Sequence, residues 1–405
     1  MLTKSSTELV RQQNSALVLS ALRRHRALSH TEIAQQTGLA SATVSAITAE
    51  LERQRMIERQ ELRPAGARGR PRVLFSQRRD AGYLVAVRIS SDAVQYSLAD
   101  YAGTLIDRLD EARDHASPST SRFVAAFREA LQRLARRSSL APEQILVVSV
   151  SSKGLVDADR AVLLWSPVFG GDVIDFASVL PEGWVAKVSL NNESLLMAHA
   201  LANRTDLGTA PGQHGVAVLS LGHSIGLGIA RRERGGDLQV SAPNFGHMLN
   251  FADGKLCRCG SLGCVEASAG FYGILRTAFE VPPDTIPAKF VPIAEMDKIA
   301  MRARQGHRMS EYAFRQAGLA LGQGMSRVIS LYDTLAIAMT GPGTRYLDLL
   351  SRGFDEGLRQ SQHVRLQGMP PVTVVAEESA LVFDGHLDRG LGEIDQQVAA
   401  TGALG

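Results

Sequence analysis

The sequence predicts an α/β protein in three parts, a winged helix-turn-helix followed by two α/β lobes. The beginning of the chain contains a helix, a glycine turn and a second helix in succession, which is the helix-turn-helix pattern. The remainder alternates between strands and helices twice over, and 405 residues exceed what one hydrophobic core normally serves. We place the parts at residues 1–80, 81–195 and 196–379.

Charge is unevenly distributed along the chain. Residues 1–80 hold 14 Lys and Arg against 7 Asp and Glu, a net charge of +7, so the remainder must carry −4 for the whole chain to reach +3. A basic segment of this kind suits the phosphate backbone of nucleic acid. No aromatic residue precedes Phe75, so the segment lacks the stacking surfaces that single strands require, and double-stranded DNA is the expected partner.

The composition also indicates a compartment. No apolar run approaches the roughly eighteen residues that a membrane-spanning helix requires, and residues 1–6 do not resemble a secretory signal. The three cysteines lie close together in the sequence, which fits a reducing environment better than a disulfide framework. We therefore expect a cytoplasmic protein with no membrane partner.

Three helices are expected before residue 54. Apolar residues fall on one stripe of a helix over residues 14–26. Ser29 and Glu32 have the spacing of a capping box that opens a second helix, and Gly38 lets the chain turn after it. A third helix is capped near Ser41, and its apolar residues face inward at the i, i+3, i+7 spacing.

The third helix has the position of a recognition helix, whose first polar residues enter the major groove. We predict that Ser41, Thr43 and Ser45 contact base edges. Strands over 56–62 and 73–77 would flank a basic tip, and its arginines suit a narrow minor groove or phosphates. These arginines are Arg68, Arg70 and Arg72. The alternative interpretation of this segment is a helical protein-interaction module with a solvated basic loop.

The rest of the chain has the pattern of two α/β lobes. For the first lobe we expect an antiparallel meander over 83–89, 93–99 and 104–107, a helix that begins at Ser119 or Ser121, and a buried strand over 145–150. For the second lobe we expect strands over 216–220, 225–230, 335–339 and 372–375, and helices over 312–331 and 346–358. Residues 280–295, which are rich in proline, are expected to form an irregular surface segment.

The cysteines predict a metal site. Cys257, Cys259 and Cys264 lie within eight residues, and His247 stands ten residues upstream of the first of them. Three thiolates and one imidazole are a tetrahedral zinc set, and four protein ligands leave no position for water, so we expect a structural zinc. Two other interpretations are three ordinary reduced thiols, which chance would scatter more widely, and an exchangeable zinc sensor, which three thiolates disfavour.

This motif and its surroundings resemble a known family. Residues 246–266 contain Gly-His-Met and then Cys-x-Cys-Gly-x-x-Gly-Cys-x-Glu, which is similar to the signature of the ROK family (repressor, ORF, kinase). The N-terminal winged helix with its Gly-Arg-Pro tip resembles the repressor branch. The resemblance covers essentially the whole chain. It implies an actin- and hexokinase-like (ribonuclease H-like) fold in two lobes, with a last helix over about 380–400 that packs back onto the first lobe. It also implies homo-oligomers that bind operators under the control of sugars, sugar phosphates or transport proteins.

The resemblance also implies that kinase chemistry has been lost. ROK kinases begin with a strand that ends in Asp-x-Gly-Gly-Thr, where glycines let backbone amides approach phosphate. In this chain the matching stretch holds Arg88, Ser90, Ser91 and Asp92, so side chains and a negative charge occupy that space. The position of the family's catalytic Asp is taken by Asn192, whose amide is not a base. We therefore expect no enzyme activity and no catalytic residue.

A sugar pocket between the lobes is a further implication of the resemblance. Its residues here would be Gly154, Asn191, Asn192, Asn244, His247 and Glu266. Amides still exchange hydrogen bonds with hydroxyls, so a sugar or polyol with altered specificity is expected. Arg88 and Lys153 would allow a phosphorylated or acidic ligand unless they are surface or ion-paired groups. The alternative is a pocket that no longer binds a ligand, in which the asparagine side chains only satisfy the hydrogen bonds of buried backbone groups.

These observations together predict a DNA-binding transcriptional regulator, a repressor of carbohydrate-related genes that acts as a dimer or tetramer. Ligand binding between the lobes would change their closure and move paired winged helices off the half-site spacing. Two alternatives stay open. One is a ROK regulator without a small-molecule ligand that a protein partner controls, and the other, which Asn192 disfavours, is a sugar kinase.

Overall fold

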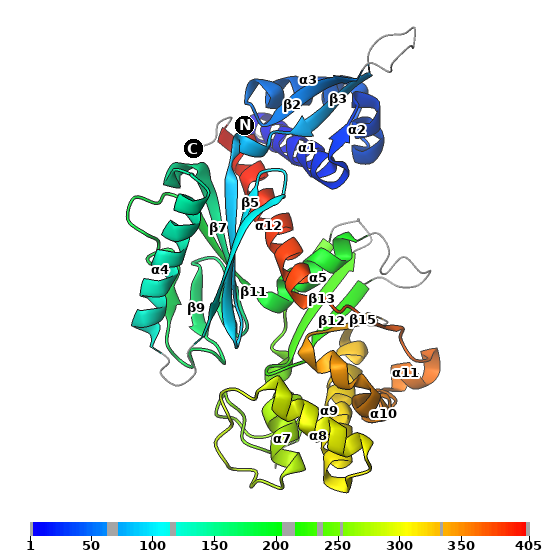
Figure 1. The fold of residues 1–405 in the computed structure, drawn as a ribbon. Helices are drawn as coiled ribbons and strands as arrows, with labels where there is room; N and C mark the ends of the chain where they lie inside the picture. The colour runs from blue at the N-terminus through cyan, green and yellow to red at the C-terminus, as the bar shows by residue number, and fades with distance from the viewer. Residues whose placement is uncertain are drawn as a thin grey trace.

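The computed structural model of the chain describes residues 3–62, 72–113, 119–204, 215–232, 238–251, 254–332 and 335–401. Three parts follow one another along the long axis of the molecule (Figure 1). A mainly helical N-terminal domain lies at one end, and two α/β lobes follow below it. The predicted class, an α/β protein with an N-terminal helix-turn-helix, is confirmed.

The N-terminal domain packs three helices on a small antiparallel sheet. Its core contains Val18, Leu22, Ile33, Val44 and Leu51, which come from all three helices. The expected helices and the two expected strands of the wing are present, and the first helix begins earlier than predicted because its polar first half has no apolar stripe to detect. The elements are α1 (Thr3–His25), β1 (Ala27–Leu28), α2 (His30–Thr37), α3 (Ser41–Arg53), β2 (Ile57–Leu62) and β3 (Arg72–Gln77).

The helix-turn-helix is defined by local capping. The Ser29 hydroxyl accepts from the Glu32 backbone N–H, and the Glu32 carboxylate accepts from the Ser29 backbone N–H at 2.8 Å, which is the predicted capping box. Gly38 ends α2 in the left-handed region with φ of +71°, where a side chain would be strained. The predicted cap at Ser41 is wrong: the N-cap is Ala40, which makes no side-chain bond, and Ser41 is already helical.

The first lobe is built on a five-stranded sheet of order β11-β7-β4-β5-β6. The expected meander is present as β4, β5 and β6, while β7 and β11 extend it in parallel. A second, three-stranded sheet escaped prediction because its strands are only two to four residues long. The bounds are β4 (Tyr83–Ile89), β5 (Ala93–Asp100), β6 (Leu105–Ala112), α4 (Thr120–Arg137), β7 (Ile145–Ser152), β8 (Leu155–Asp157), β9 (Val162–Trp165), β10 (Ile174–Asp175) and β11 (Lys187–Asn192).

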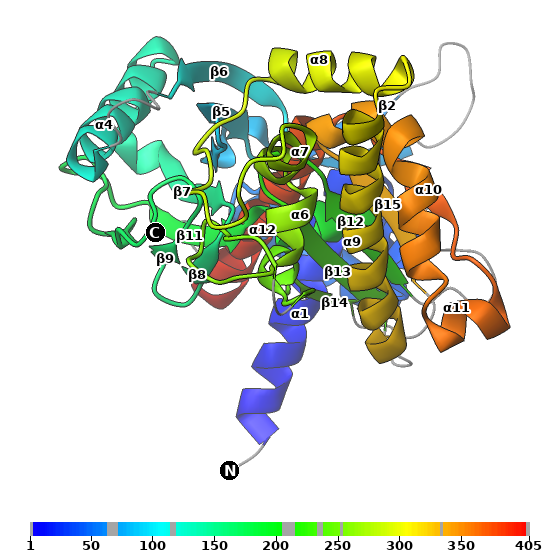
Figure 2. The same cartoon turned by 90° about the horizontal axis from the view of Figure 1, so that it is seen from below.

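The second lobe has a sheet of order β14-β13-β12-β15-β16, with helices on both faces. Figure 2 shows α6, α7, α9 and α10 in front of this sheet. All the predicted strands and helices of this lobe are present, and the segment before α8 is irregular as expected. The bounds are α5 (Glu193–Asn203), β12 (Gly215–Ser220), β13 (Gly226–Arg232), β14 (Leu238–Ser241), α6 (Val265–Ala269), α7 (Phe271–Ala278), α8 (Ile293–Arg304), α9 (Arg308–Tyr332), β15 (Ala336–Thr340), α10 (Leu347–Leu358), α11 (Gln362–Gln367) and β16 (Val372–Val374).

The last helix, α12 (Glu378–Thr401), connects all three parts (Figure 1). It packs on α5, then on β4 and β7 of the first lobe, and finally on α1. Leu391 and Ile394 of α12 belong to the same buried cluster as Leu22 of α1 and Leu84 of β4. The N-terminal domain is therefore joined to the first lobe by a continuous apolar core. No helix in the described part of the chain combines the length and hydrophobicity needed to cross a bilayer.

His386 makes the packing of α12 sensitive to acid. It is fully buried between the hydroxyls of Ser149 and Ser151, at 2.8 and 2.9 Å. Burial, with a smaller contribution from Arg88, lowers its pKa to about 3. Because the unfolded imidazole binds its proton near pH 6.5, the stability contributed by the neutral ring is present above that pH and falls by about 1.4 kcal/mol per unit below it.

Unfolding in urea between pH 7 and pH 4 should reveal this loss. His386→Gln removes the titrating ring, so its stability should depend less steeply on pH over that range. Replacing the exposed His25 by Gln is the matched control and should retain the wild-type slope. Identical slopes for H386Q and the wild type would show that His386 does not account for the acid sensitivity.

Candidate functional site

The first candidate surface is the exposed side of α3. Val44, Ile47 and Leu51 face the core, whereas Ser41 and Ser45 are exposed and Thr43 is half-buried. The predicted base-contacting residues therefore lie at the start of the helix on its open side. Of the predicted wing arginines, Arg68 and Arg70 lie outside the described residues, and Arg72 is the first residue of β3. The exposed side of α3 has the form that a recognition helix requires.

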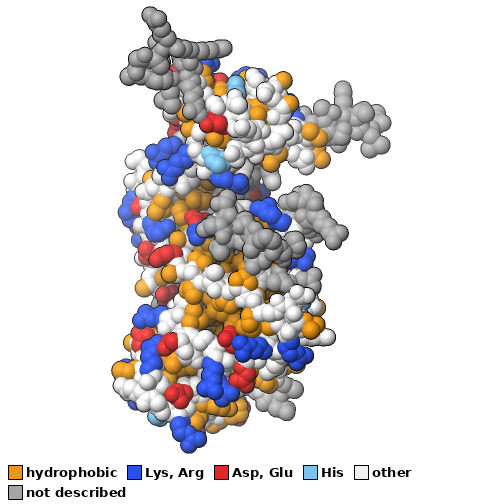
Figure 3. All heavy atoms as spheres, turned by 90° about the vertical axis from the view of Figure 1, so that its right-hand side faces the viewer, with side chains coloured by type: hydrophobic (Ala, Val, Ile, Leu, Met, Phe, Trp, Pro, Cys, Tyr) orange, Lys and Arg blue, Asp and Glu red, His pale blue; other side chains and the backbone are white. Residues whose placement is uncertain are grey.

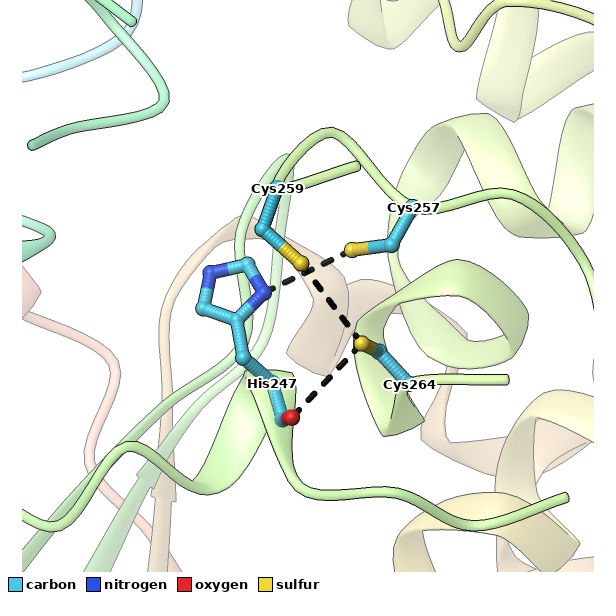
Figure 4. A group of neighbouring side chains, drawn as sticks. All are labelled: His247, Cys257, Cys259 and Cys264. Carbon is cyan, nitrogen blue, oxygen red and sulfur yellow. Dashed lines mark hydrogen bonds between the residues drawn. The ribbon is translucent and has the colours of Figure 1, made fainter. Parts of the chain in front are cut away.

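The second candidate is a cluster of the four predicted metal ligands (Figure 4). One ligand atom from each of His247, Cys257, Cys259 and Cys264 lies within 4.8 Å of all the others. The Cys259 and Cys264 sulfur atoms are 3.7 Å apart, and the Cys257 sulfur lies 3.4 Å from His247 Nδ1. Tetrahedral zinc with bonds of about 2.0–2.3 Å needs ligand separations of this size. The cluster could therefore hold one metal ion.

Burial affects the protonation of the cysteines in the cluster. Cys257 and Cys264 are buried, and burial raises the pKa of the Cys257 thiol to about 11. Thiolate is the form that coordinates, so a metal ion would have to lower this pKa through its own charge. The Tyr272 hydroxyl lies 3.4 Å from the Cys257 sulfur and adds a polar contact on the protein side. The fit to a metal ion therefore rests on the donor set, three sulfur atoms and one imidazole nitrogen.

Close to the cluster lies a small pocket between the lobes, the inner pocket, with a volume of about 70 Å³. Five of the six residues predicted for a sugar line it: Gly154, Asn192, Asn244, His247 and Glu266. The sixth, Asn191, is not among the lining residues, and its buried amide nitrogen has no hydrogen-bond partner among the described residues. A water molecule needs about 10–15 Å³ of such space, so the inner pocket in this conformation has room for only a few water molecules.

The side chain of Asn192, the residue that the resemblance to the ROK family would place at the catalytic Asp, is hydrogen-bonded to the backbone. Its side-chain oxygen caps α5 by accepting from the Ser194 N–H at 2.8 Å, and its amide donates to the Gly154 carbonyl at 2.9 Å. Gly154 has φ of +124°, and a Cβ there would lie 2.2 Å from the Trp165 carbonyl oxygen. The glycine is therefore obligatory, and Asn192 stabilises the loop that it shapes.

Four charged side chains meet where α5 and α12 begin. Arg88 pairs with Glu193 and, at 2.7 Å, with Glu378, while Lys153 lies 3.6 and 3.7 Å from the same two carboxylates. Burial alone would raise the pKa of Glu378, but Lys153 and Arg88 hold it at about 2. The charges of the two cations and the two carboxylates cancel, so the cluster has no net charge. Arg88 and Lys153 are thus ion-paired, which is the alternative to ligand binding that the sequence left open.

A larger cavity of about 430 Å³, the outer cleft, adjoins the inner pocket and shares Pro167 with it. The Trp165 ring stands edge-on to His247 at a centroid distance of 5.0 Å. This cavity was not predicted from the sequence, although Trp165 at the end of β9 and Arg258 inside the cysteine motif are signals for it. The charged and aromatic residues that line it are Arg113, Trp165, Phe169, Asp172, Arg258 and Lys289.

Comparison with known proteins supports the resemblance found in the sequence. A model of the ROK family matches residues 85–371, and a model of the IclR helix-turn-helix domain matches residues 13–61. The xylose repressor of Caldicellulosiruptor bescii is 21% identical over 88% of this chain and 90% of its own length. The DNA-binding transcriptional repressor Mlc of Escherichia coli K12 is 21% identical over 88% of this chain and 89% of its own length.

Solved structures share the fold. A ROK family transcriptional regulator described as a homologue of E. coli Mlc superposes with a TM-score of 0.67 and 18% identity, over 95% of this chain and 99% of that one. A ROK glucokinase from Streptomyces griseus, solved with glucose and AMPPNP, superposes with a TM-score of 0.55 and 22% identity. The superposition covers 76% of this chain and 98% of the glucokinase chain. Since the family model matches well over half of the sequence, the chain belongs to the ROK family and carries an IclR-type helix-turn-helix at its N-terminus.

Proposed function

We propose that this protein is a DNA-binding transcriptional repressor of carbohydrate-related genes, and that its ROK domain binds a sugar, sugar phosphate or polyol without phosphorylating it. The observation that carries the proposal is a helix-turn-helix with an open recognition face, connected through α12 to a cleft between two lobes. Relatives that match most of the chain are named xylose repressor and N-acetylglucosamine repressor, which supports a repressor role here.

The path of α12 suggests how a ligand would control DNA binding. Its first residue, Glu378, belongs to the charged cluster between the lobes, and Asp395 near its end binds Arg23 of α1. A change in lobe closure would move α12 and with it the N-terminal domain. In a homo-oligomer, paired recognition helices would then leave the spacing of about one DNA turn, or a multiple of it, that two half-sites require.

Self-association is part of the proposal. Figure 3 shows the side of the molecule on which α11 lies, the right-hand side of Figure 1. Hydrophobic side chains gather across the middle of this face. Leu366, Met369, Val372 and Val374 of the α11 and β16 region are exposed, and β16 is an edge strand of its sheet. An apolar surface beside an open edge supports a dimer or tetramer.

Zinc is the metal that we propose for the cluster of one histidine and three cysteines. His247, Cys257, Cys259 and Cys264 would hold it, and when bound it would supply structural cross-linking and no chemistry. His247 also lines the inner pocket, so the metal would set the position of this imidazole and of the loop that carries Asn244.

Operator binding provides the main test of the proposal. Ser45→Glu places a carboxylate on the open side of α3, where it should repel phosphates, and should weaken binding to a palindromic operator fragment in a gel shift by at least about tenfold. Arg70→Ala should weaken binding and reduce its salt dependence by about one counterion. Ser351→Glu, on the exposed side of α10, is the control and should bind as the wild type does. Unaltered operator affinity for S45E would exclude α3 as the recognition helix.

Two other functions are separated by simple measurements. The small inner pocket and the engaged Asn192 amide favour control by a protein partner as the second candidate. A thermal-shift screen of sugars, sugar phosphates and polyols without a single stabilising compound would support that candidate.

A kinase would form sugar phosphate from ATP and a hexose, and we expect only background turnover because Asn192 cannot act as a base.

A further inference from the structure

We infer that the outer cleft binds an anionic ligand of about the size of a sugar ring, with its acidic group on Arg113 and Arg258 and its ring against Trp165. This inference deepens the proposed function and rests on it for the ligand's regulatory role. Binding itself can be tested without DNA.

The shape and position of the outer cleft are those of a ligand site. Its volume of about 430 Å³ lies within the range of small-molecule pockets, and such pockets occur preferentially between domains. Arg113 and Trp165 come from the first lobe, whereas Arg258 and Lys289 come from the second. A ligand that contacts both sides would stabilise one particular closure of the lobes.

The charge of the outer cleft differs from that of the ionic cluster formed by Arg88, Lys153, Glu193 and Glu378. Arg113, Arg258 and Lys289 face a single carboxylate, Asp172, so these four side chains carry a net charge of +2. Asp172 accepts from the Thr120 hydroxyl. Among the described residues, none of the three cations has a carboxylate within ion-pair distance. An anion from solution would supply the missing negative charge.

Arg113 is a half-buried cation with few partners. Its guanidinium lies over the Phe169 ring at 5.1 Å and makes one long bond, of 3.4 Å, to the Ser90 carbonyl. Burial lowers the pKa of Arg113, and the more distant Asp92 offsets only part of that effect. Most of its N–H groups therefore lack acceptors among the described residues, and a carboxylate or phosphate would provide them.

Arg258 is held in place by its contacts, and two of its N–H groups make no hydrogen bond within the described residues. It stacks on Tyr272 at 4.5 Å, and its three nitrogens donate to the carbonyls of Ala288 and His223. Each terminal nitrogen makes one of these bonds and keeps a second N–H. Since the guanidinium is already oriented, little conformational entropy is lost when these groups bind an anion.

The walls of the cleft indicate what the rest of the ligand is like. Trp165 and Phe169 are half-buried and offer flat apolar surfaces on the first-lobe side, and Ile286 is exposed on the other side. A ring with apolar faces and a charged substituent matches this combination of aromatic walls and cations. The shared chemistry is a sugar-sized ring with a carboxylate or a phosphate.

The test uses the full-length protein and three probes of similar size: glucuronate, glucose 6-phosphate and neutral glucose. Isothermal titration should show at least one of the two anions binding about tenfold or more tightly than glucose, and the tighter anion identifies a carboxylate or a phosphate as the preferred group. Binding should quench Trp165 fluorescence, and the Trp165→Phe variant should lose the signal while Trp184, in the first-lobe core, remains.

Three single substitutions test whether the anion binds at the outer cleft. Arg113→Gln should weaken the preferred anion by about tenfold or more, as expected for the loss of a charge-assisted hydrogen bond, and Lys289→Gln should weaken it less because Lys289 is exposed. Arg136→Gln, at an exposed position of α4, should bind as the wild type does. A thermal midpoint equal to that of the wild type verifies that R113Q is folded.

Three results would overturn the inference: no binding of either anion, equal affinity for glucose, or unchanged anion affinity in R113Q. Failure of the proposed function would look different. In that case the protein would bind an anion with the Arg113 dependence described but would not shift operator DNA.

Discussion

Removal of zinc should destabilise the second lobe strongly and lower the thermal midpoint of the full-length protein by roughly 10 °C or more. The described residues of the segment 247–264 contain little regular structure beyond the isolated bridges Leu249 to Cys264 and Leu256 to Leu262. A metal bound by the four ligands would therefore be an important cross-link of this segment. Without the metal, the buried Cys257 and Cys264 would keep only weak packing contacts and lose this cross-link.

Cys257→Ser is the variant that should reproduce metal removal. Atomic absorption should find one zinc per wild-type chain and little in C257S, and differential scanning fluorimetry should show the drop in midpoint. Ser351→Ala, at an exposed position of α10 away from the cluster, changes no ligand and should retain both zinc and midpoint. A wild-type protein purified without zinc, or a C257S midpoint equal to that of S351A, would contradict a structural metal.

The same measurement distinguishes a structural zinc from a sensor. A sensor would release zinc to a mild chelator without loss of folding. We expect release only under conditions that also unfold the lobe, because all four ligands come from the protein and two of the cysteines are buried.

Asp395→Ala should detach the N-terminal domain from the rest of the protein at a cost of about 3–5 kcal/mol, the usual penalty for leaving one partner of a buried ion pair uncompensated. Asp395 is buried and receives two bonds from Arg23, at 2.7 and 2.9 Å, and one from the Tyr101 hydroxyl at 2.6 Å. Burial alone would lower the pKa of Arg23, but the Asp395 carboxylate raises it above its ordinary value. The variant would leave both donors inside a core with no acceptor.

Limited proteolysis and thermal unfolding should detect the change. We expect faster cleavage between the N-terminal domain and the first lobe in D395A, and a separate early transition. The matched control is Asp348→Ala, which removes an exposed pair with Arg304 and should cost less than about 1 kcal/mol. The double variant Arg23→Met, Asp395→Leu should recover much of the stability because apolar groups can fill the same space. Equal losses for D395A and D348A would show that the junction does not hold the domains together.

This junction also bears on regulation. If α12 transmits lobe closure to the N-terminal domain, D395A should still bind operator DNA but should respond less to any compound that stabilises the ROK domain. The gel shift with and without such a compound measures that coupling.

Features that depend on neighbouring residues could be predicted from the amino-acid sequence. The capping box at Ser29 and Glu32, the turn at Gly38 and the spacing of the cysteines around Cys259 act within one or a few turns of chain, so local stereochemistry specifies them. The same holds for the meander of the first lobe, whose strands follow one another directly. The first half of α1 and the short strands of the first lobe were not predicted, since neither has a periodic apolar pattern of sufficient length. The elements β11, β14, α5, α6, α7, α8 and α11 were not predicted either.

Which charged groups are available to a ligand depends on how the lobes pack in three dimensions. Arg88 lies 105 residues from Glu193 and 290 from Glu378, and Arg23 lies 372 residues from Asp395. No local pattern connects residues at such separations, because their meeting depends on how whole lobes and α12 pack. Arg113 and Arg258 are similar in type to Arg88, but the fold brings carboxylates to Arg88 and leaves the other two at the wall of a cavity. The difference between a neutralised cluster and an anion site is thus a property of packing, since an ion pair exists only where two chain segments are brought within a few ångströms.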